Sequence, residues 1–280
     1  MKKHSVSLFV LLLAISTLLT ACDGNKKKSL RLEFTTANAN ETIYLFADTT
    51  KPGANLQIDF TYIQKASDAR VKDTLNGLFQ QLCLGDDYRT MQPQEAVERY
   101  KEAYAADYRK LEPMYSKDRE EKESNATMES WYSYYRTVKG SLCFQNDALL
   151  VYRTDETEYT GGAHGTSLSR FYNISLAKLR PLHLADLFID DYKAPLTDLL
   201  WNQLMADNHV KSRAELEDMG YGTSGELEPL ENFAIDATGI TFYYNVYEIA
   251  PYVMGLIKIS LPYEAIAPLL KEGVREQYSL

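Results

Sequence analysis

The order of the hydrophobic patterns limits this chain to folds that combine sheets and helices without a regular βαβ repeat. Strand patterns occur at residues 55–63, 131–143, 147–159, 167–174 and 257–261, with a hairpin turn at 236–239. Helical patterns occur at residues 67–84, 94–111, 182–189, 194–205, 212–220 and 263–270. The charged residues 116–127 lack an apolar period and predict a solvated loop. These runs predict an α+β fold of two small domains with antiparallel sheets packed by helices.

Composition and charge exclude several classes of protein. The 280 residues are 45% hydrophobic and 25% charged, which is typical of globular proteins and excludes disordered, collagenous and polytopic membrane chains. The formal net charge is −9, and no basic stripe is present to neutralise phosphates. We therefore expect no nucleic-acid partner.

Residues 1–21 have the organisation of a secretory signal peptide. Lys2 and Lys3 precede an apolar run, Leu8–Leu19, which is too short to span a bilayer as a helix. The run ends in Leu19-Thr20-Ala21-Cys22, which looks like a bacterial lipobox, in which cleavage precedes a cysteine that becomes acylated. An ordinary secretory signal with a chance cysteine is the alternative. The sequence predicts lipidation at Cys22, a tether at residues 22–29, and contact with the membrane through the lipid.

The composition of the tether bears on which side of the membrane the protein occupies. Residues 23–28 contain one acid and three lysines, so the tether lacks the acidic run that some Gram-negative lineages use for surface export. We expect a lipid anchor in the cell envelope that faces the periplasm, at the outer membrane. Surface exposure is the alternative.

Two cysteines remain once Cys22 is assigned to the lipid. Cys83 and Cys143 would lie in an oxidising compartment, where an isolated pair is a disulfide candidate. Two buried free thiols are the equal alternative, because sequence does not give the Cα separation that a bond requires. Neither cysteine has a close Cys or His partner, so we expect no metal site.

The most distinctive segment is Tyr159-Thr160-Gly161-Gly162-Ala163-His164-Gly165. Its three glycines permit positive φ angles and close approach of the backbone, and His164 lies inside the glycine-rich loop. The glycine pair could bind an anion through backbone N–H groups, but no helix with a P-loop lysine follows, which favours a tight turn. We take five residues as ligand-binding candidates: Tyr159, Gly161, Gly162, His164 and Gly165.

This segment is followed by further motifs in a fixed order. They are Phe171-Tyr172-Asn173, Leu182-His183-Leu184-Ala185-Asp186-Leu187-Phe188, Tyr247-Glu248-Ile249-Ala250-Pro251-Tyr252, Gly255 and Leu261-Pro262-Tyr263. The ensemble resembles the C-terminal domain of unknown function that an anti-sigma-V factor and a peptidoglycan N-acetylmuramic acid deacetylase share. Residues 146–280 are assigned to this domain. Residues 30–145 resemble the smaller domain that precedes it in the deacetylase.

The resemblance implies two α+β domains outside the membrane. The corresponding region recognises lysozyme in the anti-sigma factor, and it accompanies a separate catalytic domain in the deacetylase. This chain shows no sigma-binding segment, no transmembrane helix after the signal, and no room for a deacetylase domain. Neither activity is therefore carried over, and a tethered recognition module is expected.

His164 also has an enzymatic interpretation. Histidine supplies a general base near neutral pH, and Asp155 and Glu158 are close in sequence. No nucleophile elbow or H-E-x-x-H motif completes a catalytic set. We therefore assign no catalytic residue, no metal and no cofactor. A wall-acting hydrolase or deacetylase-like enzyme that uses His164 stays as an alternative, as does a purely structural envelope lipoprotein.

Tyrosine is unusually frequent, at 21 residues, and it gathers in two stretches. Trp131, Tyr132, Tyr134 and Tyr135 lie in one stretch, and Tyr243, Tyr244, Tyr247 and Tyr252 lie in the other. Tyrosine is suited to recognition because it combines a rigid apolar face with a polar tip, but buried rings would simply be core. The function expected from the sequence is recognition of cell-wall glycan or of a wall-active protein such as lysozyme.

Overall fold

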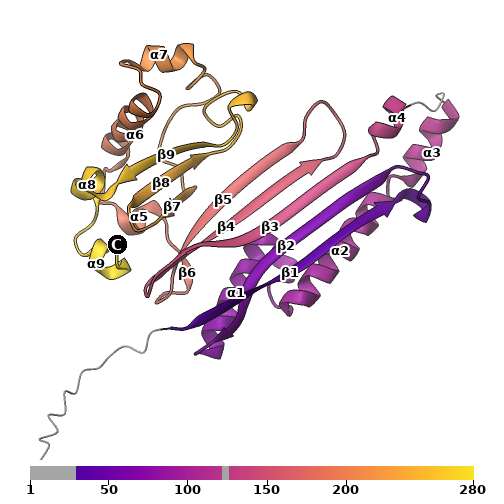
Figure 1. Cartoon of the computed structure of the whole chain (residues 1–280), viewed down its shortest axis with the longest axis horizontal. Helices are drawn as coiled ribbons and strands as arrows, with labels where there is room; N and C mark the ends of the chain where they lie inside the picture. The colour runs from indigo at the N-terminus through magenta and orange to yellow at the C-terminus, as the bar shows by residue number, and fades with distance from the viewer. Residues whose placement is uncertain (1–29, 122–125) are drawn as a thin grey trace, which may run out of the picture.

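The computed structural model describes residues 30–121 and 126–280 and contains two sheets flanked by helices (Figure 1). The larger sheet has six strands in the order β1-β2-β3-β4-β5-β6. Its strands are β1 (Leu32–Tyr44), β2 (Gly53–Ala66), β3 (Tyr134–Gln145), β4 (Leu149–Tyr159), β5 (Thr166–Ser175) and β6 (Arg180–Pro181). The smaller sheet consists of β7 (Phe233–Ile235), β8 (Gly239–Tyr244) and β9 (Ile257–Pro262). The predicted α+β architecture with antiparallel sheets is confirmed.

One strand pair departs from the antiparallel pattern. β2 and β3 run parallel, because the long helical segment between them returns the chain to the start of β2 before β3 begins. The other paired strands of the larger sheet are antiparallel. Along β2, Leu56, Ile58 and Phe60 are buried while Asn55 and Gln57 are exposed, as the alternating sequence predicts.

Helices α1 (Ala69–Cys83) and α2 (Pro93–Arg109) cover one face of the larger sheet (Figure 1). The carboxylate of Asp68 caps α1 by accepting from the backbone N–H of Arg70 at 2.9 Å. Leu75 and Phe79 of α1 are fully buried against the strands. Tyr100, Tyr104 and Tyr108 recur along α2 at helical spacing and also face the sheet, and Tyr108 is 3% exposed. This stripe is therefore core packing.

The opposite face of β4 and β5 packs against the C-terminal unit. Leu149, Leu150, Val151 and Tyr152 of β4 are all fully buried, because alternate side chains enter two different cores. The helices of the C-terminal unit are α5 (Leu184–Leu187), α6 (Lys193–Asp207), α7 (Arg213–Asp218), α8 (Tyr263–Ile266) and α9 (Val274–Tyr278). The larger sheet thus continues across the predicted domain boundary between residues 145 and 146, and that boundary stays a prediction.

Buried asparagine side chains connect the C-terminal unit to the outer edge of β5. Asn173 donates to the carbonyl of Phe233 at 2.7 Å and accepts from the N–H of Ile235 at 2.8 Å. Asn245 pairs in the same way with both backbone groups of Ser169. Asn173 thus satisfies backbone groups of β7, and Asn245 satisfies those of β5, which these strands would otherwise leave without partners.

Three sequence expectations differ from the structure. Residues 116–121, the first part of the predicted solvated loop 116–127, belong to helix α3 (Glu112–Glu121), because one buried residue, Tyr115, holds an otherwise exposed helix in place. The predicted strand at 131–143 begins later, at Tyr134, after the short helix α4 (Ala126–Ser130). Strand β1 was not predicted, because its pattern buries few residues and does not alternate regularly.

Cys83 and Cys143 are both free, and no disulfide joins them. The Cys83 thiol lies beside Tyr152 on the face of the sheet that the helices cover. A Cβ placed on Gly140 would lie 3.1 Å from Cys83 Sγ. The Cys143 thiol lies near Arg153 and Tyr243, on the side of the C-terminal unit, and the residue is exposed. The sheet lies between the two thiols, which corrects the predicted disulfide. The alternative was two buried thiols, and Cys143 differs from it because this residue is exposed.

The predicted signal peptide, Cys22 and the whole tether lie outside the described residues. Over residues 30–121 and 126–280, no helix has both the length and the apolar character needed to cross a membrane.

Candidate functional site

The glycine-rich segment forms the turn between β4 and β5. Gly161 and Gly162 have φ angles of 90° and 99°, a conformation that favours glycine over other residues. The hydroxyl of Tyr159 donates to the carbonyl of Gly162 at 2.9 Å and closes the turn. A Cβ on Gly161 would lie 3.1 Å from the carbonyl oxygen of Trp131. The predicted positive φ angles and close backbone approach are both present.

Aromatic side chains from three separate segments gather around this turn. The rings of Tyr135 and Tyr159 stack with centroids 5.8 Å apart. His164 stacks on Tyr252 at 5.3 Å, and Tyr252 contacts Tyr247 at 5.6 Å. We call these five residues the aromatic platform.

Gly165 joins the two halves of the aromatic platform. Its carbonyl accepts from the hydroxyl of Tyr252 at 3.4 Å. A Cβ at this position would lie 2.6 Å from the hydroxyl oxygen of Tyr135 and 2.9 Å from the carbonyl oxygen of Glu158. Glycine at this position therefore leaves room for the Tyr135 ring, while Tyr252 reaches the same residue through its carbonyl.

The structure sorts the two tyrosine-rich stretches by exposure. Tyr135, Tyr247 and Tyr252 are 42%, 56% and 36% exposed. In contrast, Tyr132 and Tyr244 are buried as core residues. The two stretches that the sequence treated as separate surfaces therefore contribute to a single one, with Trp131 exposed beside Gly161.

The carboxylates near His164 in sequence are bound to arginines. Asp155 Oδ1 accepts one hydrogen bond from Arg153 Nη2 and one from the hydroxyl of Ser169, each at 2.5 Å. Glu158 pairs with Arg136 at 3.0 Å. His164 itself is exposed, and no hydrogen bond or ion pair joins it to a carboxylate within the described residues. The contact with Tyr252 gives this ring a stacking role beside the turn.

Another of the sequence motifs has a structural role at helix α5. The carboxylate of Asp186 accepts from the backbone N–H of His183 at 3.0 Å and binds Arg180 through both of its oxygens. The hydrogen bonds from Arg180 lower the pKa of Asp186 well below its usual value. This pair fixes the start of α5 against β6.

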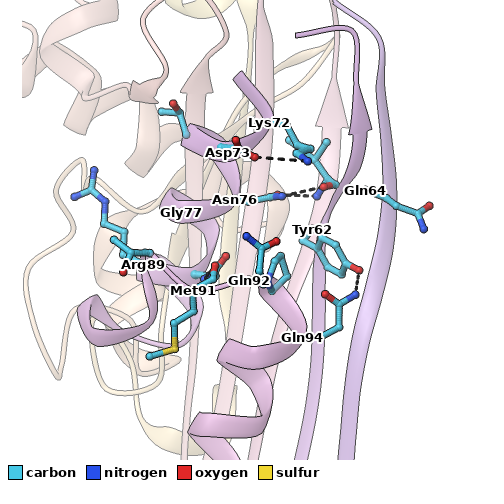
Figure 2. A pocket seen from close by; sticks show the side chains of 15 residues that line it. Tyr62, Gln64, Lys72, Asp73, Asn76, Gly77, Arg89, Met91, Gln92 and Gln94 are labelled. Carbon is cyan, nitrogen blue, oxygen red and sulfur yellow. Dashed lines mark hydrogen bonds and ion pairs between the residues drawn. The ribbon is translucent and has the colours of Figure 1, made fainter. Parts of the chain in front are cut away.

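A separate cavity of about 630 Å³ lies between β2, α1 and the loop that leads into α2 (Figure 2). Its lining is mostly polar and includes Tyr62, Lys72, Asp73, Gln92 and Gln94. The sequence analysis did not identify this site, because its residues come from three segments and form no motif. In the part of the chain that the structure describes, no cluster of three His, Cys, Asp or Glu residues could hold a metal ion.

Fold and motifs together define a two-part α+β protein whose C-terminal part carries the glycine-rich turn. Residues 49–167 match the family described as deacetylase PdaC, and residues 185–264 match the family described as protein of unknown function DUF3298. A curated relative is the peptidoglycan-N-acetylmuramic acid deacetylase PdaC of Bacillus subtilis, 28% identical over 126 residues. The match covers 44% of this chain, and this chain spans about a quarter (26%) of that protein's length.

Two solved structures extend the comparison over nearly the whole chain. A member of the DUF3298 family from Bacteroides fragilis is 47% identical, with a TM-score of 0.86, and the match covers 90% of this chain and 99% of that one. The chain belongs to the DUF3298 family. A second member, from Pseudomonas aeruginosa, is 15% identical with a TM-score of 0.61, and the match covers 87% of this chain and 96% of that one. At that identity it shows a shared fold.

Proposed function

We propose that this protein is a lipid-anchored recognition module of the cell envelope that binds cell-wall glycan through the aromatic platform. The observation that carries the proposal is the set of exposed rings fixed around Gly165. Tyrosine rings offer large, rigid contact faces with a polar edge, and they lose little conformational entropy on binding. The flat faces suit sugar rings, and the hydroxyls suit their polar groups.

The family relationship is consistent with this ligand. The curated relative is named for its action on peptidoglycan. The match to the deacetylase PdaC family, residues 49–167, includes the β4–β5 turn. The proposal takes from that name the class of ligand and not the deacetylation.

The position of the platform also suits a tethered protein. β1 begins beside Ala66 at one end of β2, whereas Tyr135 pairs with Asn55 near the other end. At about 3.3 Å per residue, the eleven residues between Ala66 and Asn55 span about 36 Å. The long sheet in Figure 1 would therefore present the platform away from a membrane to which the N-terminus is attached.

A wall-active protein such as lysozyme is the second candidate ligand. Val253 is 89% exposed beside Tyr252, so an apolar residue extends the surface of the platform. Exposed apolar and aromatic residues together are typical of protein-binding surfaces.

A co-sedimentation screen of the purified full chain tests both ligands. We expect the protein to sediment with insoluble peptidoglycan, and we expect soluble wall oligosaccharides to reduce the sedimented fraction by competition. Retention on immobilised lysozyme without retention on peptidoglycan would replace the first ligand with the second. Failure to bind either would contradict the proposed function.

A further inference from the structure

The polar cavity beneath α1 lies far from the aromatic platform. Tyr62 lines the cavity, and it is seven residues along β2 from Asn55, which pairs with Tyr135. At about 3.3 Å per residue, this separation is about 23 Å along the strand. The cavity is therefore a second site, independent of the surface used in the proposed function.

The walls of the cavity are fixed by buried hydrogen bonds. The side-chain amide of Gln80, 1% exposed, donates to the carbonyls of Tyr88 and Met91, the latter at 3.0 Å. Asn76 exchanges two hydrogen bonds, of 2.8 and 2.9 Å, with the backbone of Ile63 in β2. These contacts hold the loop before α2 and strand β2 at set positions on α1, and Figure 2 shows those made by Asn76.

A glycine brings the loop against the helix. A Cβ on Gly77 would lie 2.9 Å from the carbonyl oxygen of Arg89, so a larger residue would displace the loop. A cavity with walls fixed in this way loses little conformational freedom when a ligand enters. Its volume, about 630 Å³, lies within the range of small-molecule sites.

Side-chain amides give the cavity its chemical character. Gln92 lines it and makes no side-chain hydrogen bond to any other residue that the structure describes. Gln94 donates to the hydroxyl of Tyr62, which leaves the amide oxygen of Gln94 available as an acceptor. Lys72 and Asp73 lie 3.6 Å apart at one end of the site and balance each other's charge.

These features favour an uncharged ligand with donors and acceptors close together. A primary amide side chain can donate to the carbonyl of a secondary amide and accept from its N–H at the same time. Two cations line the cavity. The Lys72 ammonium has a carboxylate partner, and the Arg89 guanidinium is directed away from Tyr62 and Gln92 (Figure 2), so a multiply charged anion would meet too few unpaired cations.

We infer that this cavity binds a small uncharged ligand that carries secondary amide groups. Acetamido sugars and blocked short peptides share this chemistry, and both would present the N–H and carbonyl groups that Gln92 can meet. The site adds a second binding function to the protein and does not depend on the aromatic platform.

Titration of the full chain with three probes, followed by NMR at the backbone amides of Gly77 and Thr90, tests the inference. The probes are N,N′-diacetylchitobiose, cellobiose, which lacks the acetamido groups, and a blocked alanine dipeptide. We expect saturable shifts with at least one amide probe and none with cellobiose. The amide probe that binds identifies the source of the ligand. Shifts with cellobiose equal to those with diacetylchitobiose, or no shifts with either amide probe, would overturn the inference.

Variants separate this site from the platform. Gln92→Ala should weaken binding of the amide probe about tenfold, the loss expected for one or two hydrogen bonds. Gln57→Ala, on the same stretch of sheet but outside the cavity, should bind as the native chain does. Tyr252→Ala should also leave the cavity shifts unchanged. Native affinity in Gln92→Ala, or loss of the shifts in Tyr252→Ala, would contradict the cavity assignment, and the second result would move the ligand to the platform.

Discussion

Single residues decide where the aromatic platform forms and which thiols solvent can reach. Gly165 leaves room for the hydroxyl of Tyr135 and accepts the hydroxyl of Tyr252 at its carbonyl, and this role is visible only in three dimensions. The sequence marked Gly165 as unusual because of its glycine-rich neighbourhood. It could not show that a ring 30 residues upstream occupies the space of a Cβ, since that contact depends on the pairing of β3 with β4.

The two described cysteines should differ sharply in reactivity. Burial raises the pKa of Cys83 to about 12, and the nearby Glu156 and Asp155 carboxylates add to the effect. Cys143 is exposed. We expect iodoacetamide at pH 8.5 to modify Cys143 in the folded protein, and Cys83 only after unfolding. Peptide mass spectrometry without reductant distinguishes this result from a disulfide, in which both cysteines would resist until reduced.

At the scale of elements, regular periodicity made most strands and helices predictable. β2, α1, α2 and the β7–β8 hairpin match their expected positions because their buried residues recur with the period of the element. α3 and β1 did not follow this logic. α3 has one buried residue, and β1 is an edge strand in which Ala37 and Ile43 are the buried positions. Such elements depend on their neighbours rather than on their own pattern.

Asn173 tests how the two sheets are held together. Asn173→Ala would leave the carbonyl of Phe233 and the N–H of Ile235 without partners in a buried region. We expect the free energy of unfolding in urea to fall by about 2–4 kcal/mol. Asn38→Ala, an exposed asparagine on β1, is the matched control and should change it by less than about 0.5 kcal/mol. Equal effects of the two changes would show that Asn173 does not link the sheets.

The Arg180–Asp186 pair at α5 predicts a response to acid. The pKa of Asp186 is lowered in the folded state, mainly by hydrogen bonds from Arg180, so its contribution to stability is present above the unfolded pKa of about 3.9. That contribution is lost as the pH falls through the lower, folded pKa. Asp186→Asn should therefore reduce the slope of unfolding free energy against pH below about pH 4. An unchanged slope would contradict the assigned role of this carboxylate.

At the scale of the whole molecule, the two proposed binding regions lie near opposite ends of a sheet shared by both halves of the chain. The cavity is close to the end of the sheet at which β1 begins, and the aromatic platform is near the far end. The sequence predicted the fold class and the importance of the glycine-rich turn. It did not predict the cavity, because Gln80, Gly77 and Gln92 acquire their roles only when a loop folds back onto α1.

The proposed attachment to the membrane makes its own prediction about the N-terminus. If residues 1–21 are a lipoprotein signal peptide, the mature protein should begin at an acylated Cys22. Mass spectrometry of the N-terminal peptide should show loss of residues 1–21 and the added acyl mass. Cys22→Ser should accumulate uncleaved precursor without the acyl mass. A mature protein with unmodified Cys22 would contradict lipid anchoring.

Glycan binding by the aromatic platform is the central claim, and the affinity of platform variants for peptidoglycan measures it most directly. In a sedimentation isotherm, Tyr252→Ala should weaken binding by about 3- to 10-fold, because loss of one aromatic contact is worth about 0.5–1.5 kcal/mol. Ile189→Ala changes an exposed residue outside the platform, so it should bind nearly as the native chain does. Tyr252→Phe keeps the ring but loses the hydroxyl that donates to Gly165, so it should weaken binding less than Tyr252→Ala does. Equal affinity of Tyr252→Ala and the native chain would contradict the claim.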